Sequence, residues 1–557
     1  MDTRLMVISN SVDQLECRSP VWDGYDIPTY AQQCDGQAST AVAKKIRHGS
    51  SVKAAHLSGI YLGKPLPCTA FNRPHRRPVL LFVHGESYEY GTGNAYDLSV
   101  LAGFSGTVCI TLNYRLGILG FLSLKEGHSN GNFALFDLQA AILWIRTNIE
   151  RFGGDPDQMT LMGYGHGAAL IHLFSLSRLA QGAISKSIKR LILLNGSGLA
   201  PWATSNSAAE VNRALEKMLL GDLAYGITHN SSLKNLSLSE LQTTRVSPAG
   251  TSAAMSEQQK LYNKAKGPIA SQNRSEENSS VRKPTLGELV FKQLKQLSVK
   301  RIIQLQNNLS DALCASRLGP VLSKHLFPSL IFSESSIFGA TSSGNGPGTD
   351  RTGAIKWEST LFARADLLVG LVEKPGASFY RKSQWTDSLS AEKERCLQNI
   401  FPHDPRAIAA VVDFFYENGD QEAFSEQSVD GRRPRSTELD QILTILSDGL
   451  YLAPAVQTLQ LHLSLKKADR QPSTAKARTF LAMFRHHSLA NSAQTNQREM
   501  NKTTVTGSTF GEDLAYWMGA PLVNNKTMNL FPGPYTGDDA AVSRKLLFLL
   551  TTFIHKG

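Results

Sequence analysis

The stretch Thr160-Leu-Met-Gly163-Tyr164-Gly165-His166-Gly167-Ala-Ala-Leu170 carries three glycines at alternate positions. It follows Phe152-Gly-Gly-Asp155-Pro156 and leads into an apolar run, a pattern that predicts a strand, a sharp turn and then a helix. Glycine at Gly163 and Gly167 suits a turn in which strand and helix pass close together. The central residue, Gly165, has no side chain and therefore offers no nucleophile.

Alternating apolar segments surround this turn. Strands are predicted at 78–83, 107–112, 158–162, 189–195, 365–370 and 478–486, and helices at 132–149, 405–416 and 436–446. We expect Asn132 to cap the first of these helices, and Thr536 with Asp539 to form a capping box for a closing helix that runs to His555. Strands that alternate with helices favour an α/β fold with a mostly parallel sheet covered on both faces.

Composition narrows the function classes. The chain has 557 residues and a net charge of +11, but its Lys and Arg residues are scattered without an interleaved aromatic stripe, which argues against nucleic-acid binding. The six cysteines show no metal-ligand spacing, and no cofactor motif is recognised. The segment 1–10 lacks the apolar core of a signal peptide, and no window reaches the roughly 18 consecutive apolar residues of a membrane span.

Polar segments interrupt the pattern. Residues 246–284 are rich in Ser, Asn, Gln, Lys and Glu and are predicted to be a disordered insertion within one domain that covers 18–557. A Gly/Ser/Thr-rich break follows at 339–353. Besides Asn195, the sequons that could accept glycans are at Asn230, Asn235, Asn273, Asn278, Asn308, Asn501 and Asn525.

Four further blocks stand in a recognisable order. They are 83–94 (Val-His-Gly-Glu-Ser-Tyr, then Gly-Thr-Gly-Asn), 111–123, 131–139 and 152–156. From about Trp22 to Gly557 the chain resembles the carboxylesterase type B, or cholinesterase-like, family, and within it the neuroligins, a non-catalytic adhesion branch. The resemblance implies an α/β-hydrolase fold. Family members have two strands before the Trp22 block, for which this chain has little room, so those N-terminal strands are expected to be truncated.

The same resemblance locates a catalytic triad that has lost its functional groups. In such hydrolases the order is Ser, Glu or Asp, then His, and the matching positions here are Gly165, Pro375 and Phe510. The oxyanion loop, Gly85-Glu86-Ser87, also departs from the consecutive glycines of active esterases. A glutamate at position 86 is expected to place negative charge near the oxyanion. The resemblance therefore implies a pseudo-esterase.

An alternative is an atypical ester hydrolase with a shifted site. Its candidate residues are Glu373, Glu512, His486 and His487. Against it stands the elbow, which fixes the nucleophile at a position with no serine. Other polar residues have structural interpretations: Ser87 and Ser197 as turn hydroxyls, His166 as a packed side chain, and Arg115 with Asp155 as an ion pair under the elbow.

Partners follow from the resemblance alone. It implies recognition of a protein on an opposing cell surface, as neuroligins recognise neurexins across a synapse, and hence a location at the plasma membrane. No calcium or neurexin residues are transferred, because 378–396 matches nothing recognisable. A third interpretation is an assembly module of a larger secreted protein. Homodimerisation is expected through the closing helix, with helix 405–416 beside it; the apolar residues assigned to that contact are Leu546, Leu547, Leu550, Phe553 and Ile554.

Overall fold

The computed structural model describes the greater part of the chain. The described residues are 3–8, 56–62, 76–124, 129–205, 208–229, 286–309, 316–323, 326–327, 360–379, 389–400, 409–412, 415–416, 438–468, 477–488, 507–523, 528, 530–531 and 533–557. They divide into two compact units. The first unit comprises Met1–Ser123, Asn130–Ala208 and Ser310–Gly557, and the second comprises Leu124–Ser129 and Ala209–Leu309.

An eight-stranded sheet forms the centre of the first unit, in the order β1-β10-β9-β8-β7-β3-β4-β2. All neighbouring strands are parallel except β2, which is antiparallel to β4. The strands are β1 (Thr3–Ile8), β2 (His56–Leu62), β3 (Arg77–Val83), β4 (Val108–Asn113), β7 (Gly154–Tyr164), β8 (Ile188–Leu194), β9 (Asp366–Val372) and β10 (Thr479–Phe484). A separate pair contains β5 (Ser123–Leu124) and β6 (Ser129–Asn130).

The predicted α/β-hydrolase architecture, a mostly parallel sheet between helices, is confirmed, and all six predicted strands are present. Their continuous apolar runs arise because both faces of a parallel sheet are covered. The sequence patterns missed the two edge strands, β1 and β2. The expectation of truncated N-terminal strands therefore needs a qualification, because residues 3–8 pair with β10 at one edge.

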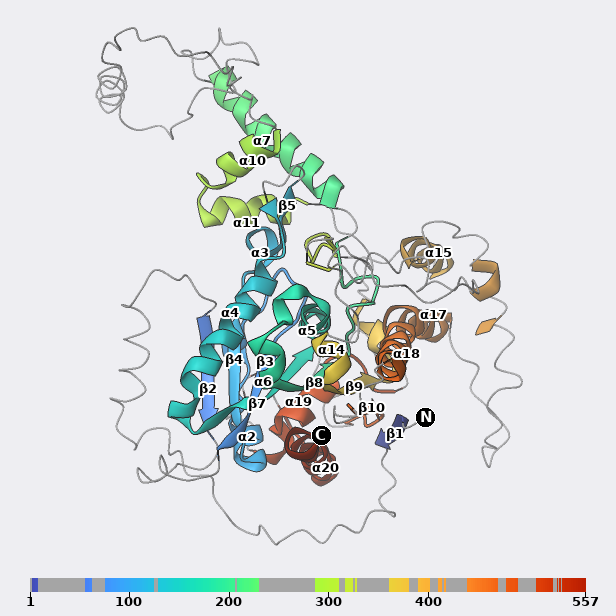
Figure 1. The fold of residues 1–557 in the computed structure, drawn as a ribbon. Coiled ribbons are helices and arrows are strands. Elements are labelled where there is room, and N and C mark those ends of the chain that lie inside the picture. The colour runs from blue at the N-terminus through green and yellow to red at the C-terminus, as the bar shows by residue number, and fades with distance from the viewer. Residues whose placement is uncertain are drawn as a thin grey trace, which may run out of the picture. The chain divides into compact units, whose positions relative to one another are not determined.

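Helices cover both faces of the sheet. One apolar cluster joins strand side chains such as Phe82 and Met162 to α2 (Ser99–Ser105), α19 (Glu512–Met518) and α20 (Gly537–Lys556). The opposite face contacts α4 (Phe133–Asn148), α5 (His166–Leu176) and α6 (Ala183–Ser187). In Figure 1, α4 and α5 lie above the strands, whereas α2, α19 and α20 gather below them.

The remaining elements of the first unit are short helices and one long helical run. They are η3 (Gly93–Ala95), α3 (Gly117–Phe121), η5 (Ile149–Phe152), η6 (Arg178–Ala180), α14 (Leu361–Arg364), η8 (Pro375–Phe379), α15 (Leu389–Ile400), α17 (Glu438–Ser447), the π-helical turn η10 (Asp448–Leu452), α18 (Ala453–Ala468) and η13 (Ala520–Leu522). The run Leu439–Ser464 is long and apolar enough to cross a membrane. However, its His462 is buried and bonds to Thr479 of β10, so the run is a core element here.

Helix ends show which capping predictions hold. The capping box of α20 is confirmed, because Thr536 and Asp539 exchange side-chain to backbone hydrogen bonds. Asn132 stands at the N-cap position of α4 as predicted, but its side chain makes no capping hydrogen bond. Its side chain instead forms hydrogen bonds with the backbone N–H and the carbonyl of Val321. The backbone φ of Asn132 itself is +59°. Of the predicted helix 405–416, residues 409–412 and 415–416 are described and are helical.

The second unit contains α7 (Ala208–His229), α10 (Leu286–Leu294) and α11 (Val299–Asn307). Ser298 caps α11 by accepting a hydrogen bond from the backbone of Arg301. The predicted insertion 246–284 and the break 339–353 lie outside the described residues. So do all the sequons except Asn195 and Asn308, of which Asn308 is exposed. The single domain 18–557 stays a prediction.

Candidate functional site

The glycine-rich stretch forms a sharp elbow at the carboxyl edge of the sheet. Strand β7 ends at Tyr164 and α5 begins at His166, so Gly165 makes the turn, with φ +51° and ψ −119°. A Cβ built on Gly163 would lie 2.6 Å from the backbone N of Ala168. One built on Gly167 would lie 2.2 Å from the carbonyl oxygen of Val83. The predicted close passage of strand and helix is confirmed.

Two more glycines are required by the same crowding. A Cβ on Gly85 would lie 1.9 Å from the backbone N of Gly167, and one on Gly196 would lie 2.1 Å from the carbonyl oxygen of Gly165. Both distances are to backbone atoms, which cannot move aside as a flexible side chain could. The elbow is therefore enclosed by the loop after β3 and the turn after β8.

Phe510 occupies the space above the elbow. A Cβ on Gly165 would lie 2.8 Å from Cζ of Phe510 and 2.8 Å from the carbonyl oxygen of Gly85. The Phe510 ring also packs against Tyr164, with centroids 4.9 Å apart. The residue at the histidine position thus fills the volume into which a nucleophile would project.

The loop after β3 presents a carbonyl where hydrolases present hydrogen-bond donors. In an α/β-hydrolase the N–H after the nucleophile and an N–H from this loop form the oxyanion hole. Here the N–H of His166, the residue after Gly165, donates to the carbonyl oxygen of Gly85 at 3.2 Å. That donor is already satisfied, so the arrangement offers a developing oxyanion one stabilising group fewer.

Glu86 is held by residues of its own neighbourhood. Its Oε2 lies 2.8 Å from Nδ1 of His84, and its Oε1 accepts a hydrogen bond from the Tyr96 hydroxyl at 2.6 Å. Burial acts to raise the pKa of Glu86, but the hydrogen bond and charge of His84 together with Tyr96 bring it below its ordinary value. The sequence predicts a Glu86 carboxylate near the oxyanion, whereas in the structure the group bonded to the N–H of His166 is the carbonyl of Gly85.

Aromatic rings form a continuous row across the site. Neighbouring centroids are 4.5–5.9 Å apart along the order Tyr88, His166, Trp202, Tyr451, Phe510 and Tyr164. His166 is packed, as expected, and burial lowers its pKa to about 3. Residues 316–323 contact the same region, since Ser316 donates a hydrogen bond to the carbonyl of Trp202. Arg317 makes a bidentate ion pair with Glu89. Stacked side chains therefore pack directly against the elbow.

A buried polar network anchors the segment that carries Phe510. Asp513 accepts hydrogen bonds from the Tyr164 hydroxyl at 2.8 Å, from Nδ2 of Asn195 at 2.9 Å and from Nε1 of Trp517 at 3.2 Å. The backbone N–H of Gly511 donates to the Tyr164 hydroxyl at 2.6 Å. Asn195 is fully buried, so its sequon is not available to a glycan. Sequence reasoning missed this network, although Asp513 lies three residues after Phe510.

The network predicts a pH-dependent stability. Burial raises the pKa of Asp513 from its ordinary 3.8 to about 6. The folded protein therefore binds more protons between these values than the unfolded chain, and this group's contribution to stability falls as pH rises through that window. The shift corresponds to a few kcal/mol, at about 1.4 kcal/mol per unit.

Asp513→Asn isolates this effect. Urea unfolding of the wild type and of the variant from pH 4 to pH 7 is expected to show the variant gaining relative stability by roughly 2–3 kcal/mol as pH rises. The comparison with the variant is needed because burial lowers the pKa values of His166 and His172 from 6.5 to about 3, which gives the opposite trend over this pH range in both proteins. A difference that stays constant with pH would contradict the assignment.

Pro375, which the family resemblance matches to the acid of the triad, lies on the adjoining segment. Pro375 follows β9 and opens η8, and its neighbour Lys374 pairs with Thr509 next to Phe510. The N–H of Gly376 donates to the Ser447 hydroxyl at 3.0 Å, which ties this turn to α17. The structure thus places Gly165, Pro375 and Phe510 at one edge of the sheet, and none of them carries an ionisable or nucleophilic group.

The residues considered for a shifted site are divided among separate pairs. Nδ1 of His487 lies 3.2 Å from Oε2 of Glu512, Glu373 accepts from Arg485 at 2.7 Å, and Nε2 of His486 lies 2.6 Å from Asp539. The hydroxyls of this region have other acceptors: Ser488 donates to Asp539 and Ser508 to the carbonyl of Phe484. The geometry does not assemble a nucleophile, a base and an orienting acid from these residues.

Three structural interpretations can be checked. Ser87 and Ser197 are turn hydroxyls, accepting from the backbone N–H of Glu89 and Leu199 respectively. The expected Arg115–Asp155 ion pair is wrong. Arg115 pairs with Asp137 of α4 at 2.8 Å, because it follows the end of β4 and lies beside the first turns of that helix. In the described part of the chain, no cluster of three His, Cys, Asp or Glu side chains is arranged to hold a metal ion.

Comparison with known proteins defines the class. The family model described as "Carboxylesterase family" matches residues 60–256 and 270–557. Among solved structures, a PNB esterase superposes with a TM-score of 0.53 over 87% of this chain and 74% of its own, at 18% identity. That level of identity supports the shared fold alone. The chain belongs to the carboxylesterase family.

Its curated relatives include neuroligins. Neuroligin-1 of Caenorhabditis elegans is 25% identical over 493 residues, which is 87% of this chain and 50% of that protein. Human neuroligin-2 is 40% identical over 149 residues, or 27% of this chain and 17% of that protein. Mouse neuroligin-2 is 37% identical over 183 residues. The chain therefore spans half or less of the length of these relatives.

Proposed function

We propose that this protein is a catalytically inactive, cholinesterase-like recognition protein of the neuroligin type, which uses the hydrolase scaffold to bind another protein. The hydrogen bond from the N–H of His166 to the carbonyl of Gly85 carries the proposal. It supports inactivity independently of the missing side chains, because a hydrolase needs that donor for the oxyanion. The Phe510 ring above Gly165 adds a steric reason.

A fluorophosphonate probe tests the inactive part of the proposal. Such probes label a serine only when a base activates it. The expected result is no labelling of the folded protein under conditions that label an active carboxylesterase mixed into the same sample. Labelling that disappears on heat denaturation would contradict the proposal and favour the shifted-site hydrolase instead.

The recognition part rests on the neuroligin relatives. Because they are named neuroligins, we propose a neurexin-like protein on an opposing cell surface as partner, and a cell-surface location for this protein. Surface plasmon resonance with an immobilised neurexin ectodomain, with and without calcium, is expected to show saturable binding. The absence of binding in both conditions would remove neurexins as the partner without affecting the inactive site.

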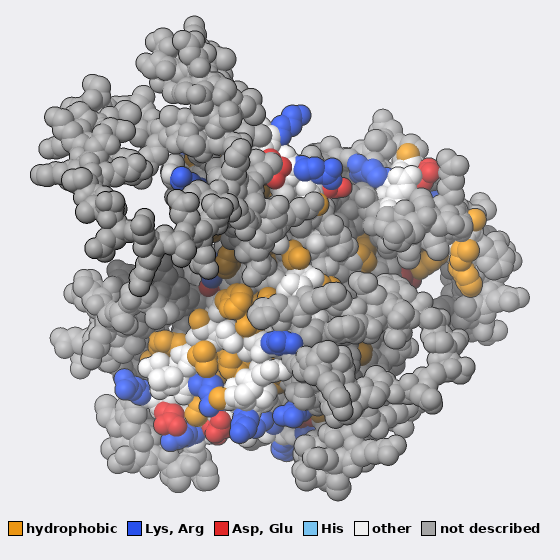
Figure 2. Space-filling model, turned by 45° about the horizontal axis from the view of Figure 1, so that its top comes forward, with side chains coloured by type: hydrophobic (Ala, Val, Ile, Leu, Met, Phe, Trp, Pro, Cys, Tyr) orange, Lys and Arg blue, Asp and Glu red, His pale blue; other side chains and the backbone are white. Residues whose placement is uncertain are grey.

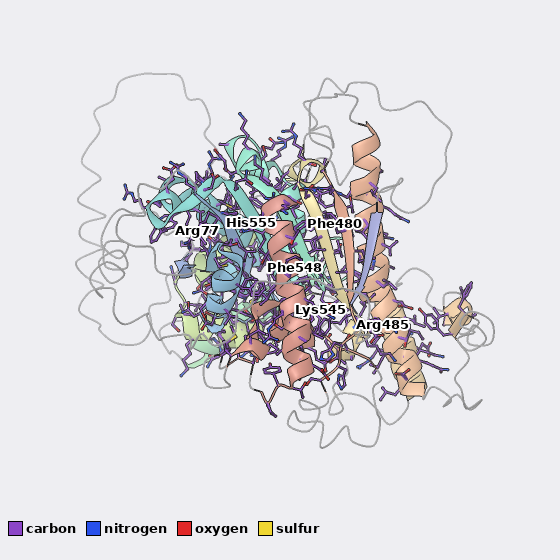
Figure 3. The ribbon with its side chains drawn as sticks, turned by 90° about the horizontal axis from the view of Figure 1, so that it is seen from below. Arg77, Phe480, Arg485, Lys545, Phe548 and His555 are labelled. Atoms are coloured by element: carbon purple, nitrogen blue, oxygen red, sulfur yellow. The ribbon has the colours of Figure 1, made fainter. Side chains whose placement is uncertain are left out.

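The structure changes which residues of α20 can form the contact in the proposed dimer. The five residues expected at the interface, Leu546, Leu547, Leu550, Phe553 and Ile554, are buried in the chain's own core. The outward side of α20 instead carries Phe548, which is 55% exposed, together with the exposed Lys545. Figure 3 looks at this side of α20 from below, with Lys545 and Phe548 along the helix. We propose that a homodimer pairs the α20 helices through Phe548.

The helix geometry is compatible with this pairing. A two-fold axis at Phe548 runs the two helices antiparallel, which sets Lys545 of one copy opposite Thr551 of the other, so like charges do not meet. Each copy then covers an aromatic side chain that is otherwise in water.

Phe548→Arg is expected to convert the dimer to a monomer in sedimentation at micromolar concentration. Two arginines would meet at the axis, while the fold would be unaffected because residue 548 is exposed. Val456→Arg, on the exposed side of α18, is the matched control and should stay dimeric. A wild-type protein that sediments as a monomer would refute the dimer.

A further inference from the structure

The outward side of helix α4 is apolar along most of its length. Phe136 is 40% exposed and Leu143 is 46% exposed, with the partly exposed Ala140 between them at helical spacing. From Phe133 to Ile145 the only ionisable side chain is Asp137, which is buried and paired with Arg115. Helices at the surface of a globular protein normally present charged and polar residues to water. We name this outward side, Phe136, Ala140 and Leu143, the α4 stripe.

The α4 stripe leads to a group of cations at the carboxyl end of the helix. Arg146 of α4 donates to the carbonyl of Ala183 and to the hydroxyl of Ser187, which brings α6 against this end. Nearby are Arg151 and Lys186, both exposed, and Lys189, whose Nζ donates to the carbonyl of Lys186 at 2.6 Å. Arg151, Lys186 and Lys189 are together called the α6 cation group.

The α6 cation group differs from cations at the opposite edge of the sheet. After the carboxyl ends of β4, β9 and β10, Arg115, Lys374 and Arg485 each pair with a carboxylate. Among the described residues, no carboxylate lies within ion-pair distance of the three members of the α6 cation group. Figure 2, which brings the upper side of the molecule forward, shows hydrophobic side chains gathered left of centre, with Lys and Arg side chains and some Asp and Glu side chains below them.

We propose that the α4 stripe and the α6 cation group bind one amphipathic helix of a partner protein, which lies antiparallel to α4 and carries acidic residues in its first turn. The stripe runs from Phe136 to Leu143, about 12 Å along the helix axis, which matches about two turns of a partner helix. Asp and Glu are favoured in the first turn of a helix by its dipole. An antiparallel arrangement places that turn beside the α6 cation group, whereas a parallel one leaves the cations facing a carboxyl-terminal end.

This surface is distinct from the elbow and from the outward side of α20. The proposal does not depend on the loss of esterase activity or on dimerisation. It concerns recognition, so failure of neurexin binding and failure of helix binding are separate results.

The probe is a fluorescent model peptide of about 16 residues with Leu at successive i, i+3, i+4 and i+7 positions and Glu in its first turn. A second peptide of the same composition carries its Glu residues in the last turn. Fluorescence anisotropy at low salt is expected to show the first peptide binding about tenfold more tightly, with the difference shrinking at high salt because exposed charges are screened.

Variants test the contribution of the α4 stripe and that of the α6 cation group separately. Leu143→Glu is expected to lower the affinity for the first peptide at least about tenfold, because binding would bury a charge in an apolar contact. Lys186→Glu with Lys189→Glu is expected to abolish the preference between the two peptides without abolishing binding. The matched controls are Val456→Glu for the apolar change and Arg213→Glu with Lys217→Glu for the charge reversal, all at exposed positions.

Three outcomes would overturn the proposal. They are equal affinity of the two peptides for the wild type, binding that Leu143→Glu leaves unchanged, and no binding of either peptide. Self-association of the wild type that Leu143→Glu removes and Phe548→Arg does not would also overturn it, because the α4 stripe would then be a contact between two copies.

Discussion

Gly165→Ser is expected to leave the protein without measurable esterase activity. A hydroxyl at the elbow would have no histidine to accept its proton, since residue 510 is Phe, and an unassisted serine hydroxyl is a weak nucleophile at neutral pH. The structure adds a steric reason. The new Cβ would lie 2.8 Å from both the Phe510 ring and the carbonyl of Gly85. It would also impose a backbone φ of +51° on a residue with a side chain, which destabilises the fold.

Rebuilding the side chains is expected to recover little. Gly165→Ser with Phe510→His, Pro375→Glu and Glu86→Gly restores the triad and removes the loop carboxylate. However, the N–H of His166 would still be bound to the carbonyl of Gly85. Losing one oxyanion donor costs about 10²–10³ in kcat in a working hydrolase. We therefore expect at most weak turnover of a short-chain aryl ester, and turnover at the level of an active carboxylesterase would contradict the proposed closed elbow.

Gly167→Ala is expected to prevent stable folding. Its Cβ would lie 2.2 Å from the carbonyl oxygen of Val83 and 2.5 Å from that of His84. Both are backbone atoms at the end of a central strand, so β3 or α5 would have to shift. A destabilisation of more than about 4 kcal/mol is expected, which exceeds most single substitutions. Circular dichroism and thermal unfolding of the purified variant measure it.

Gly103→Ala is the matched control. Gly103 lies in α2 with nothing within 4 Å of the position its Cβ would take. Alanine there should be neutral or stabilise by up to about 1 kcal/mol, since glycine is a poor helix former. If both variants retained wild-type stability, the close contact of β3, β7 and α5 at the elbow would be refuted.

The elbow was predictable from sequence because its requirement is local. Gly163 is imposed by a strand and a helix that are adjacent in the chain, so residue spacing reveals it, whereas the contact that requires Gly167 is with Val83 and His84 at the end of β3. The contact of Gly85 with Gly167 and that of Gly196 with Gly165 join segments distant in sequence. No local pattern separates such glycines from those of ordinary loops. For the same reason, the sequence alone suggests an ion pair between Arg115 and Asp155, whereas the folded chain brings Arg115 to Asp137.

The orientation of α20 shows a second limit. Its last turns are apolar on nearly every side, so periodicity could not tell which side faces the core. The sequence predicts that its most apolar residues contact a partner, whereas the structure buries them in the chain's own core and leaves Phe548 exposed. The edge strands β1 and β2 were missed because an edge strand is set by its neighbour in the sheet as much as by its own residues. The network around Asp513 joins β7, β8 and α19, and therefore emerges only with the fold.

The central claim is that the elbow performs no chemistry, and steady-state hydrolysis of p-nitrophenyl acetate by the wild-type protein tests it most directly. The measurement varies protein concentration and adds an organophosphate inhibitor in a parallel series. We predict a rate equal to that of buffer with a matched amount of an inert protein, independent of concentration and inhibitor. Hydrolysis that rises in proportion to protein concentration and is blocked by the organophosphate would contradict the account and return this chain to the active esterases.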